Sequence, residues 1–128
     1  MSKVVFDASV LLAVIYREPG SEKLIPELLA RSVVSAVNLA EVHSKLVGSG
    51  WPAQDAWEDA SSPANEIASF TAAQAEIAGD LVKQTRALGL SLGDRACLAL
   101  ALDLRAPVYT ADRSWKQLSL GVRIHVIR

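Results

Sequence analysis

The sequence of 128 residues contains a single cysteine and few aromatic side chains, and it has no excess of basic residues. One cysteine cannot form an internal disulfide, and Cys97 lies in an apolar run, so we expect a small core residue in a reducing compartment. The formal net charge of −1 argues against a general nucleic-acid binder, because that affinity needs clustered Lys and Arg. Any contact with nucleic acid must therefore be local or depend on bound cations.

We expect no membrane span, signal peptide or flexible linker in this sequence. No run approaches the roughly 20 apolar residues of a transmembrane helix. The apolar N-terminal stretch is interrupted by Asp7 and Ser9, and no small-residue cleavage site follows it. No tract rich in Pro, Gly or Ser divides the chain, so the sequence predicts one domain over residues 1–128, located in the cytoplasm. The 51% hydrophobic content suffices for a core and leaves apolar surface for a partner.

Short apolar runs alternate with helical patterns along the whole chain. Strands are predicted over residues 4–6, 32–35, 66–70, 107–110 and 122–127. Helices are predicted over residues 9–16, 21–30, 37–47, 52–60, 71–88 and 113–118, together with an almost wholly apolar helix that begins near residue 91. This alternation predicts an α/β fold with a doubly wound parallel sheet flanked by helices on both faces.

Four acidic residues stand at the predicted ends of strands or near the starts of helices. Asp7 follows the first strand, and Asp112 comes two residues after the fourth. Glu41 lies about one turn into the helix after the second strand, and Asp94 lies in the first turn of the apolar helix. Functional groups of an open parallel sheet gather at the carboxyl ends of its strands, so we expect these acids to converge. Four carboxylates repel one another unless a hard cation such as Mg²⁺ or Mn²⁺ binds between them.

Each acid also has a structural alternative. Asp94 stands three residues after Ser91, which is the spacing of a capping box at a helix start. Glu41 stands four residues before Lys45, a favourable spacing for a helical ion pair, and Asp112 could cap a short helix. Zinc is disfavoured as the ion, because it prefers Cys and His ligands and the two histidines show no ligand spacing.

Four segments, in order, resemble the motifs of PIN domains: residues 5–9, 38–41, 91–96 and 110–113. They span nearly the whole chain, and its short length is similar to that of VapC toxins in bacterial toxin–antitoxin pairs. The resemblance implies a metal-dependent endoribonuclease in which metal-activated water hydrolyses an RNA phosphodiester. The implied ligands of Mg²⁺ or Mn²⁺ are Asp7, Glu41, Asp94 and Asp112.

The resemblance also implies supporting residues and partners. Ser9 and Thr110 would support the pocket by hydrogen bonds, although Ser9 is equally a candidate cap for the first helix. Arg113 and Arg95 each follow a site aspartate, and we favour Arg113 as a contact for substrate phosphate. The implied partners are an RNA substrate and a cognate antitoxin protein, in a homodimer or a toxin–antitoxin hetero-oligomer, without a membrane.

Two other functions remain open from the sequence. A response-regulator receiver domain has similar length and architecture, but it usually carries a pair of acids at the first strand and a late-strand Lys. Here Asp7 has no acidic neighbour, and no Lys follows a late strand. The second alternative is a catalytically inactive binding module with the PIN fold, although all four acidic positions are filled.

Overall fold

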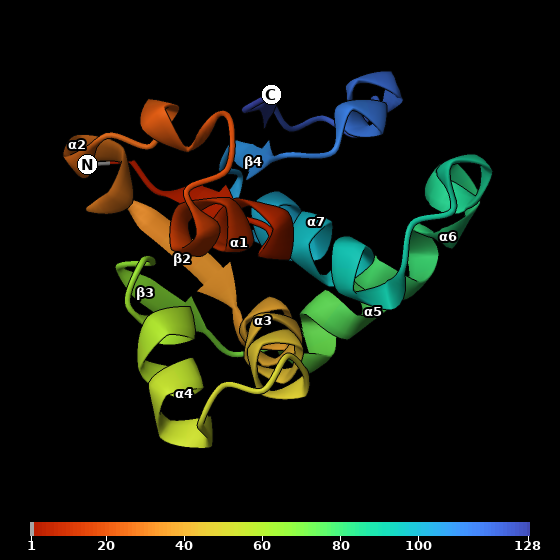
Figure 1. Cartoon of the computed structure of the whole chain (residues 1–128). Helices are drawn as coiled ribbons and strands as arrows, with labels where there is room; N and C mark the ends of the chain where they lie inside the picture. Colours follow the sequence, from red (N-terminus) through yellow and green to blue (C-terminus); the bar gives the residue numbers. More distant parts are fainter. Residues whose placement is uncertain (1) are drawn as a thin grey trace.

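The computed structural model describes residues 2–128 and contains a five-stranded sheet in which every strand pairing is parallel (Figure 1). The strand order is β3-β2-β1-β4-β5. The strands are β1 (Val4–Phe6), β2 (Ser32–Ser35), β3 (Glu66–Ala68), β4 (Val108–Thr110) and β5 (Ile124–Val126). This sheet, with helices on both faces, confirms the predicted α/β fold class. The neighbours of β1 are β2 and β4, whereas the 2-1-3-4-5 order of receiver-like folds would place β3 beside β1.

The helices follow the strands in the predicted alternation. The α-helices are α1 (Ala8–Tyr16), α2 (Pro26–Leu29), α3 (Ala36–Gly48), α4 (Ala53–Ser61), α5 (Ala72–Asp80), α6 (Val82–Thr85) and α7 (Leu92–Leu104). Three short 3₁₀ segments are η1 (Ser21–Lys23), η2 (Arg86–Leu88) and η3 (Arg113–Gln117). None of the helices in residues 2–128 has both the length and the apolar content to cross a membrane.

Two predicted helices are wrong in extent. The helix predicted over residues 21–30 is split into η1 and α2, because Pro26 disfavours a helical conformation at Ile25, whose ψ is 159°. The helix predicted over residues 71–88 is split into α5, α6 and η2. The break between α5 and α6 lies at Leu81, whose ψ of −11° departs from the α-helical value of about −42°. Thr85 donates its hydroxyl proton to the Leu81 carbonyl, a local bond that competes with regular helix.

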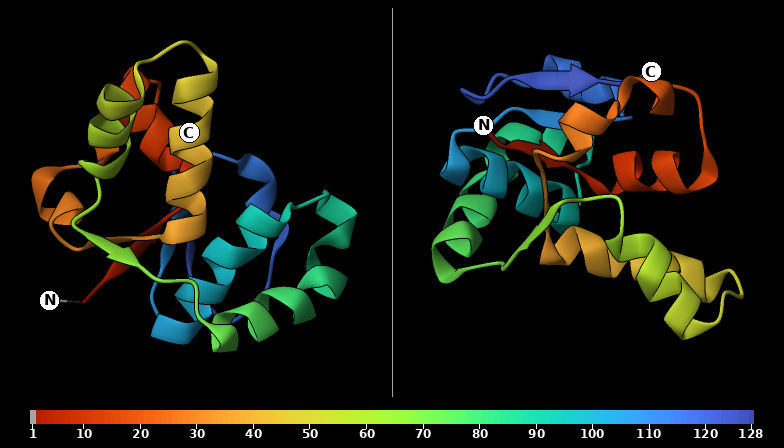
Figure 2. Two further views of the ribbon diagram at one scale, coloured as in Figure 1. Left: turned by 90° about the horizontal axis from the view of Figure 1, so that it is seen from below. Right: turned by 90° about the vertical axis from the view of Figure 1, so that its left-hand side faces the viewer.

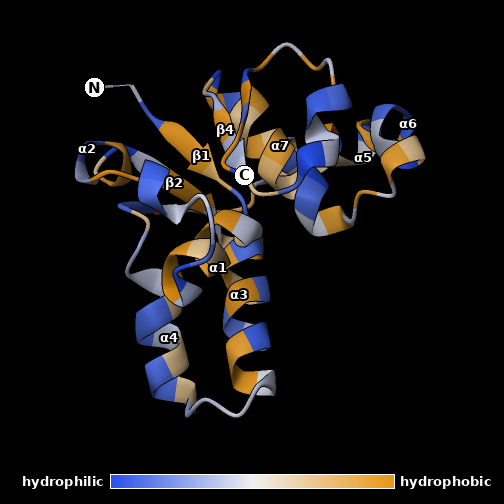
Figure 3. Ribbon diagram, turned by 45° about the horizontal axis from the view of Figure 1, so that its top comes forward, coloured by the Kyte–Doolittle hydropathy of each residue, from blue (hydrophilic) through white to orange (hydrophobic). Residues whose placement is uncertain are grey.

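Alternate residues of the central strands face two separate apolar layers. Val4, Phe6 and Val34 pack with α1, α3 and α4, while Val5 and Val33 pack with α7. Figure 2 shows helices on both sides of the sheet, and Figure 3 shows apolar colouring along β1 and β2. Each fully buried Val or Phe side chain contributes about 1.5–3 kcal/mol. The period-2 pattern therefore holds the sheet between its helices and sets its register.

The register of β1 determines which residues meet at the carboxyl edge. Phe6 pairs with Val34 on β2 and with Tyr109 on β4. The next residue along β1 is Asp7, and its amide donates to the Tyr109 carbonyl at 3.2 Å. Asp7 is thus placed beside the end of β4, where Thr110 completes the strand.

Candidate active site

Asp7 is the buried centre of the site, and three donors hold its carboxylate. The Ser9 hydroxyl donates to Oδ1 at 2.6 Å, and the Val10 amide donates to the same oxygen at 2.9 Å. The Thr110 hydroxyl donates to Oδ2 at 2.6 Å. The bond from Val10 makes Asp7 the N-cap of α1, so the alternative that Ser9 caps this helix is wrong. The Ser9 oxygen instead accepts from the Ala111 amide at 2.8 Å, which ties α1 to the end of β4.

Burial makes the negative charge of Asp7 unfavourable. It raises the pKa of this carboxyl from 3.8 to about 6. The hydrogen bonds from Ser9, Thr110 and Val10 act in the opposite direction, and the charge of Asp94 adds a smaller upward contribution to the pKa. The donors therefore offset only part of the desolvation cost, and the site as described lacks a compensating positive charge beside this carboxylate.

Glu41 is directed toward the start of α7 by Asn38. The buried Asn38 amide nitrogen donates at 2.9 Å both to Glu41 Oε1 and to the Gly93 carbonyl. The Glu41 carboxylate lies so close to Gly93 that a side-chain Cβ at this position would overlap it. The ion pair with Lys45 is not formed, since the salt bridges among the described residues are Lys3–Glu66 and Arg128–Glu18.

Asp94 lies in the first turn of α7, directly after the Gly93 position that the Glu41 carboxylate contacts. Its Oδ2 accepts from the Ser91 amide at 3.0 Å, and its own amide donates to the Ser91 hydroxyl, so the predicted capping box is confirmed. One carboxylate oxygen remains for another ligand. Burial raises the pKa of the Cys97 thiol well above its usual range, and the charges of Asp7, Asp94 and Glu41 raise it further. Cys97 is thus an inert core residue beneath three convergent carboxylates.

Asp112 lies at the margin of this group. Its amide donates to the Thr110 hydroxyl at 3.0 Å, so it is linked to Asp7 through one side chain. Its Oδ1 accepts from the amide and the hydroxyl of Ser114, which makes it the N-cap of η3. The structural alternative for Asp112 therefore holds, while Oδ2 is left for solvent or a ligand.

The donor set fits a hard cation with oxygen ligands. Asp7, Glu41 and Asp94 are held at one edge without a basic partner, and the Gly93 position leaves room for the Glu41 carboxylate. The N-terminal end of α7 adds a partial positive charge that favours anions there. Within residues 2–128, however, no three His, Cys, Asp or Glu side chains lie close enough to hold one ion as they stand. Binding would therefore require one or more of these side chains to move toward the ion.

The two candidate arginines differ in their surroundings. Arg95 donates through Nη1 to the Ala78 carbonyl at 2.8 Å, so it joins α7 to α5. Arg113 is exposed at the start of η3 and lines a cavity of mixed charge with Lys23, Arg128, Glu18 and Glu22. Of the two, only Arg113 is available to a ligand at the surface next to Asp112.

Asn38 and Gly93 were not predicted as site residues. Both lie within motif segments, but their contact joins residues 55 positions apart. The sequence does contain a signal: Asn38 stands about one turn before Glu41, and Gly93 directly precedes Asp94. Neither the orientation of the amide nor the closeness of the helices follows from that pattern.

Comparisons with known proteins identify the architecture. A family model described as the PIN domain matches residues 4–120. The DNA-bound VapBC structure from Salmonella typhimurium is 18% identical, with a TM-score of 0.80 over 100% of both chains. VapBC2 from Rickettsia felis, bound to a promoter DNA fragment, is 21% identical, with a TM-score of 0.73 over 94% of this chain and 96% of that one.

A third similar structure is VapC20 from Mycobacterium tuberculosis, described as a toxin that cleaves the sarcin-ricin loop. It is 18% identical, with a TM-score of 0.73 over 94% of this chain and 99% of that one. No curated protein sequence matches the chain. At these identities the structural likeness establishes a shared fold and leaves activity to be argued from the site.

The raised pKa of Asp7 predicts a pH dependence of stability in metal-free protein. The folded state binds this proton more tightly than the unfolded state, so stability falls as pH rises from about 4 to about 6. Asp7→Asn removes this loss, which amounts to on the order of 2–3 kcal/mol at pH 7. Denaturant unfolding in EDTA should show that the free energy of unfolding of the variant increases relative to that of the wild type as pH rises from about 4 to about 6. Equal pH dependence of the two proteins would contradict the assignment.

The contact between Glu41 and Gly93 predicts a selective defect in cation binding. Gly93→Ala should displace the flexible Glu41 carboxylate and weaken Mn²⁺ binding about tenfold or more, while helix propensity keeps the protein folded. Gly79→Ala is the matched control, because a Cβ there meets nothing within 4 Å. Calorimetric titration with Mn²⁺ distinguishes the two. Equal Mn²⁺ affinity in wild type and Gly93→Ala would show that this placement of Glu41 is unimportant.

Proposed function

The chain belongs to the PIN domain family, and from that premise we propose that it is a metal-dependent endoribonuclease acting as the toxin of a toxin–antitoxin pair. The observation that carries the proposal is the buried Asp7 carboxylate, whose unfavourable charge lies near Asp94, while the charges of Asp7, Asp94 and Glu41 all act on the Cys97 thiol. The similar VapBC complexes and the RNA-cleaving VapC20 support the same activity and partner class.

In this proposal the carboxylates divide into a fixed group and an adjustable group. Asp7 is rigid, because Ser9 and Thr110 hold both of its oxygens, while each oxygen keeps lone-pair capacity for a cation. Asp94 offers the oxygen that its helix cap does not use, and Asn38 holds the Glu41 carboxylate beside Gly93 at the start of α7. When bound there, Mg²⁺ or Mn²⁺ would lower the pKa of a water molecule and stabilise charge on the scissile phosphate.

RNA binding must then be local, as the net charge of −1 requires. The exposed guanidinium of Arg113 stands next to Asp112 at the margin of the site, where a phosphate oxygen could accept from it. Asp112, which is held by Ser114 and Thr110, would lie beside the substrate phosphate that Arg113 binds. The inactive-module alternative predicts the same fold and the same acids, so only measured cleavage separates it from an enzyme.

We propose that the antitoxin binds the N-terminal helices, where the exposed apolar surface is small. Most apolar residues between positions 10 and 29 serve the core, because α1 and α2 pack against the sheet. The exposed ones are Tyr16 at the end of α1 and Ile25 before α2, which are 46% and 51% exposed. Tyr16 also makes an edge-to-face contact with Trp51, which extends this apolar surface toward α4.

The proposed chemistry predicts loss of cleavage in Asp94→Asn and in EDTA. An amide keeps the helix cap but is a poor ligand for a hard cation, so the rate on single-stranded RNA should fall on the order of 100-fold or more. Asp80→Asn, at the end of α5, is the matched control and should retain full activity. Mg²⁺ or Mn²⁺ added after EDTA should restore cleavage by the wild type.

Mass analysis of the RNA ends provides a second readout of the same prediction. Attack by water leaves a 5′-phosphate and a 3′-hydroxyl, whereas attack by the substrate's own 2′-hydroxyl leaves a cyclic phosphate. The second route needs paired general acid and base groups, but His43 packs on Trp57 and His125 stacks on Tyr109. Cyclic phosphate ends formed in EDTA would refute the proposed mechanism.

The antitoxin surface predicts an escape variant. Induction of the wild type should arrest bacterial growth, and co-expression of the small antitoxin from the neighbouring reading frame should restore it. Tyr16→Glu combined with Ile25→Glu should stay toxic but resist this rescue, because buried charge would destabilise the complex. Val82→Glu, on α6, where the side chain is also exposed at 37%, is the control and should be rescued. Harmless expression of soluble wild type, or full rescue of the double variant, would contradict the proposal.

A further inference from the structure

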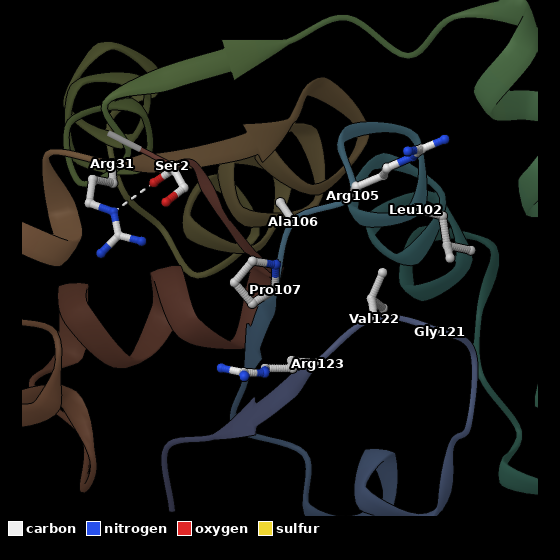
Figure 4. A pocket seen from close by; sticks show the side chains of 9 residues that line it. All are labelled: Ser2, Arg31, Leu102, Arg105, Ala106, Pro107, Gly121, Val122 and Arg123. Carbon is white, nitrogen blue, oxygen red and sulfur yellow. Dashed lines mark hydrogen bonds between the residues drawn. The ribbon is translucent and has the colours of Figure 1, made fainter.

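A second cavity lies at the opposite edge of the sheet, where the strands begin. Its volume is about 680 Å³, within the range of small-molecule sites, which is roughly 300–1,000 Å³. It is lined by residues that precede β1, β2, β4 and β5 (Figure 4): Ser2, Arg31, Leu102, Arg105, Ala106, Pro107, Gly121, Val122 and Arg123. Ser2 and Asp7 are five residues apart along an extended strand, so the two sites are separated by roughly 16 Å.

The cavity gathers positive charge without an acidic partner. Three arginines line it, and none of its described lining residues is acidic, although the whole chain is slightly negative. The salt bridges among residues 2–128 involve other side chains. Arg105 has a local explanation, because it caps the negative C-terminal end of α7, and Figure 4 shows it extending away from the other two arginines. Arg123 caps no helix, and the side chain of Arg31, which follows α2, donates to the Ser2 carbonyl through Nε alone.

Arg31 and Arg123 stand on either side of Pro107 in Figure 4. Arg31 is oriented by its Nε, which donates to the Ser2 carbonyl at 2.6 Å and leaves both terminal nitrogens for a ligand. Arg123 is fixed at its backbone, where its carbonyl accepts from Val108. Their strands are separated by three strand spacings, so the Cα atoms lie roughly 14 Å apart. A single phosphate would reach one arginine well, whereas an elongated anion would reach both.

The remaining lining is apolar. Leu102, Ala106, Pro107 and Val122 form a wall beside the arginines, and an inorganic anion would leave this wall in contact with water. Guanidinium groups bind phosphate oxygens in pairs, and apolar walls accept flat rings. We propose that this cavity binds a nucleoside polyphosphate, with its phosphates on Arg31 and Arg123 and its base against Leu102 and Val122.

This site is independent of the proposed ribonuclease activity, so it can be tested with that activity absent. The probes are ATP and GTP, with inorganic tripolyphosphate and adenosine as the separate halves of the ligand. Each is titrated calorimetrically in EDTA into the Asp94→Asn protein, which excludes divalent cations and hydrolysis. Nucleoside triphosphates should bind more tightly than either half, and affinity should fall as salt is added.

Variants then locate the binding. Arg31→Gln and Arg123→Gln should each weaken triphosphate binding about tenfold, because each removes a charge-assisted contact. Arg86→Gln, which changes an exposed arginine on η2, is the matched control and should leave binding unchanged. Thermal unfolding checks that each variant is folded, and Arg123→Gln keeps the test valid if loss of the Ser2 contact disturbs Arg31→Gln.

Four results would overturn the proposal. They are absence of nucleotide binding, binding that neither arginine variant weakens, tripolyphosphate affinity equal to that of the nucleotides, and tighter binding of an acidic peptide than of ATP. None of these results bears on RNA cleavage by the wild type, so failure here is distinguishable from failure of the proposed function.

Discussion

The burial of one carboxylate at the end of β1 is the constraint on which the rest of the site depends. Asp7 caps α1 with Oδ1 and accepts from β4 through Thr110, so the same two oxygens join a helix start to a strand end. Three donors do not compensate for its desolvation, since its pKa remains near 6. A charge kept at such a cost in a core position is typical of a functional group rather than of packing.

The short strands and the helices α3 and α7 carry the residues that bring the other site groups toward Asp7. The strands are short and apolar, so their register delivers Asp7 and Thr110 to one edge without long loops. Gly93 lets α7 approach the Glu41 carboxylate, and Asn38 satisfies that carboxylate from within α3. The structural alternatives raised for Asp94 and Asp112 prove correct, yet they do not compete with ligand binding, because a cap uses one carboxylate oxygen and leaves the other.

The sequence predicted the parts of this arrangement that depend on local pattern. Apolar runs such as 4–6 and 32–35 gave the strands, and position relative to them selected the acids at the carboxyl edge. The long helix predicted over 71–88 was wrong. A continuous helical pattern in the sequence does not reveal that the backbone at Leu81 departs from α-helical geometry. The contact of Asn38 with Gly93 could not be predicted either, since it depends on how α3 and α7 pack. The cavity at the amino edge gathers three arginines from three separate segments and has no sequence motif.

The central claim is that the Asp7 charge is balanced by a bound cation, and titration of this carboxyl by ¹³C NMR tests it most directly. In EDTA the pKa should lie near 6, and in saturating Mg²⁺ it should fall to the ordinary value of 3.8 or below. The carboxyl signal of Asp80, at the end of α5, is recorded in the same spectra as the internal control for general ionic effects. A pKa for Asp7 that stays near 6 in saturating Mg²⁺ would contradict the account.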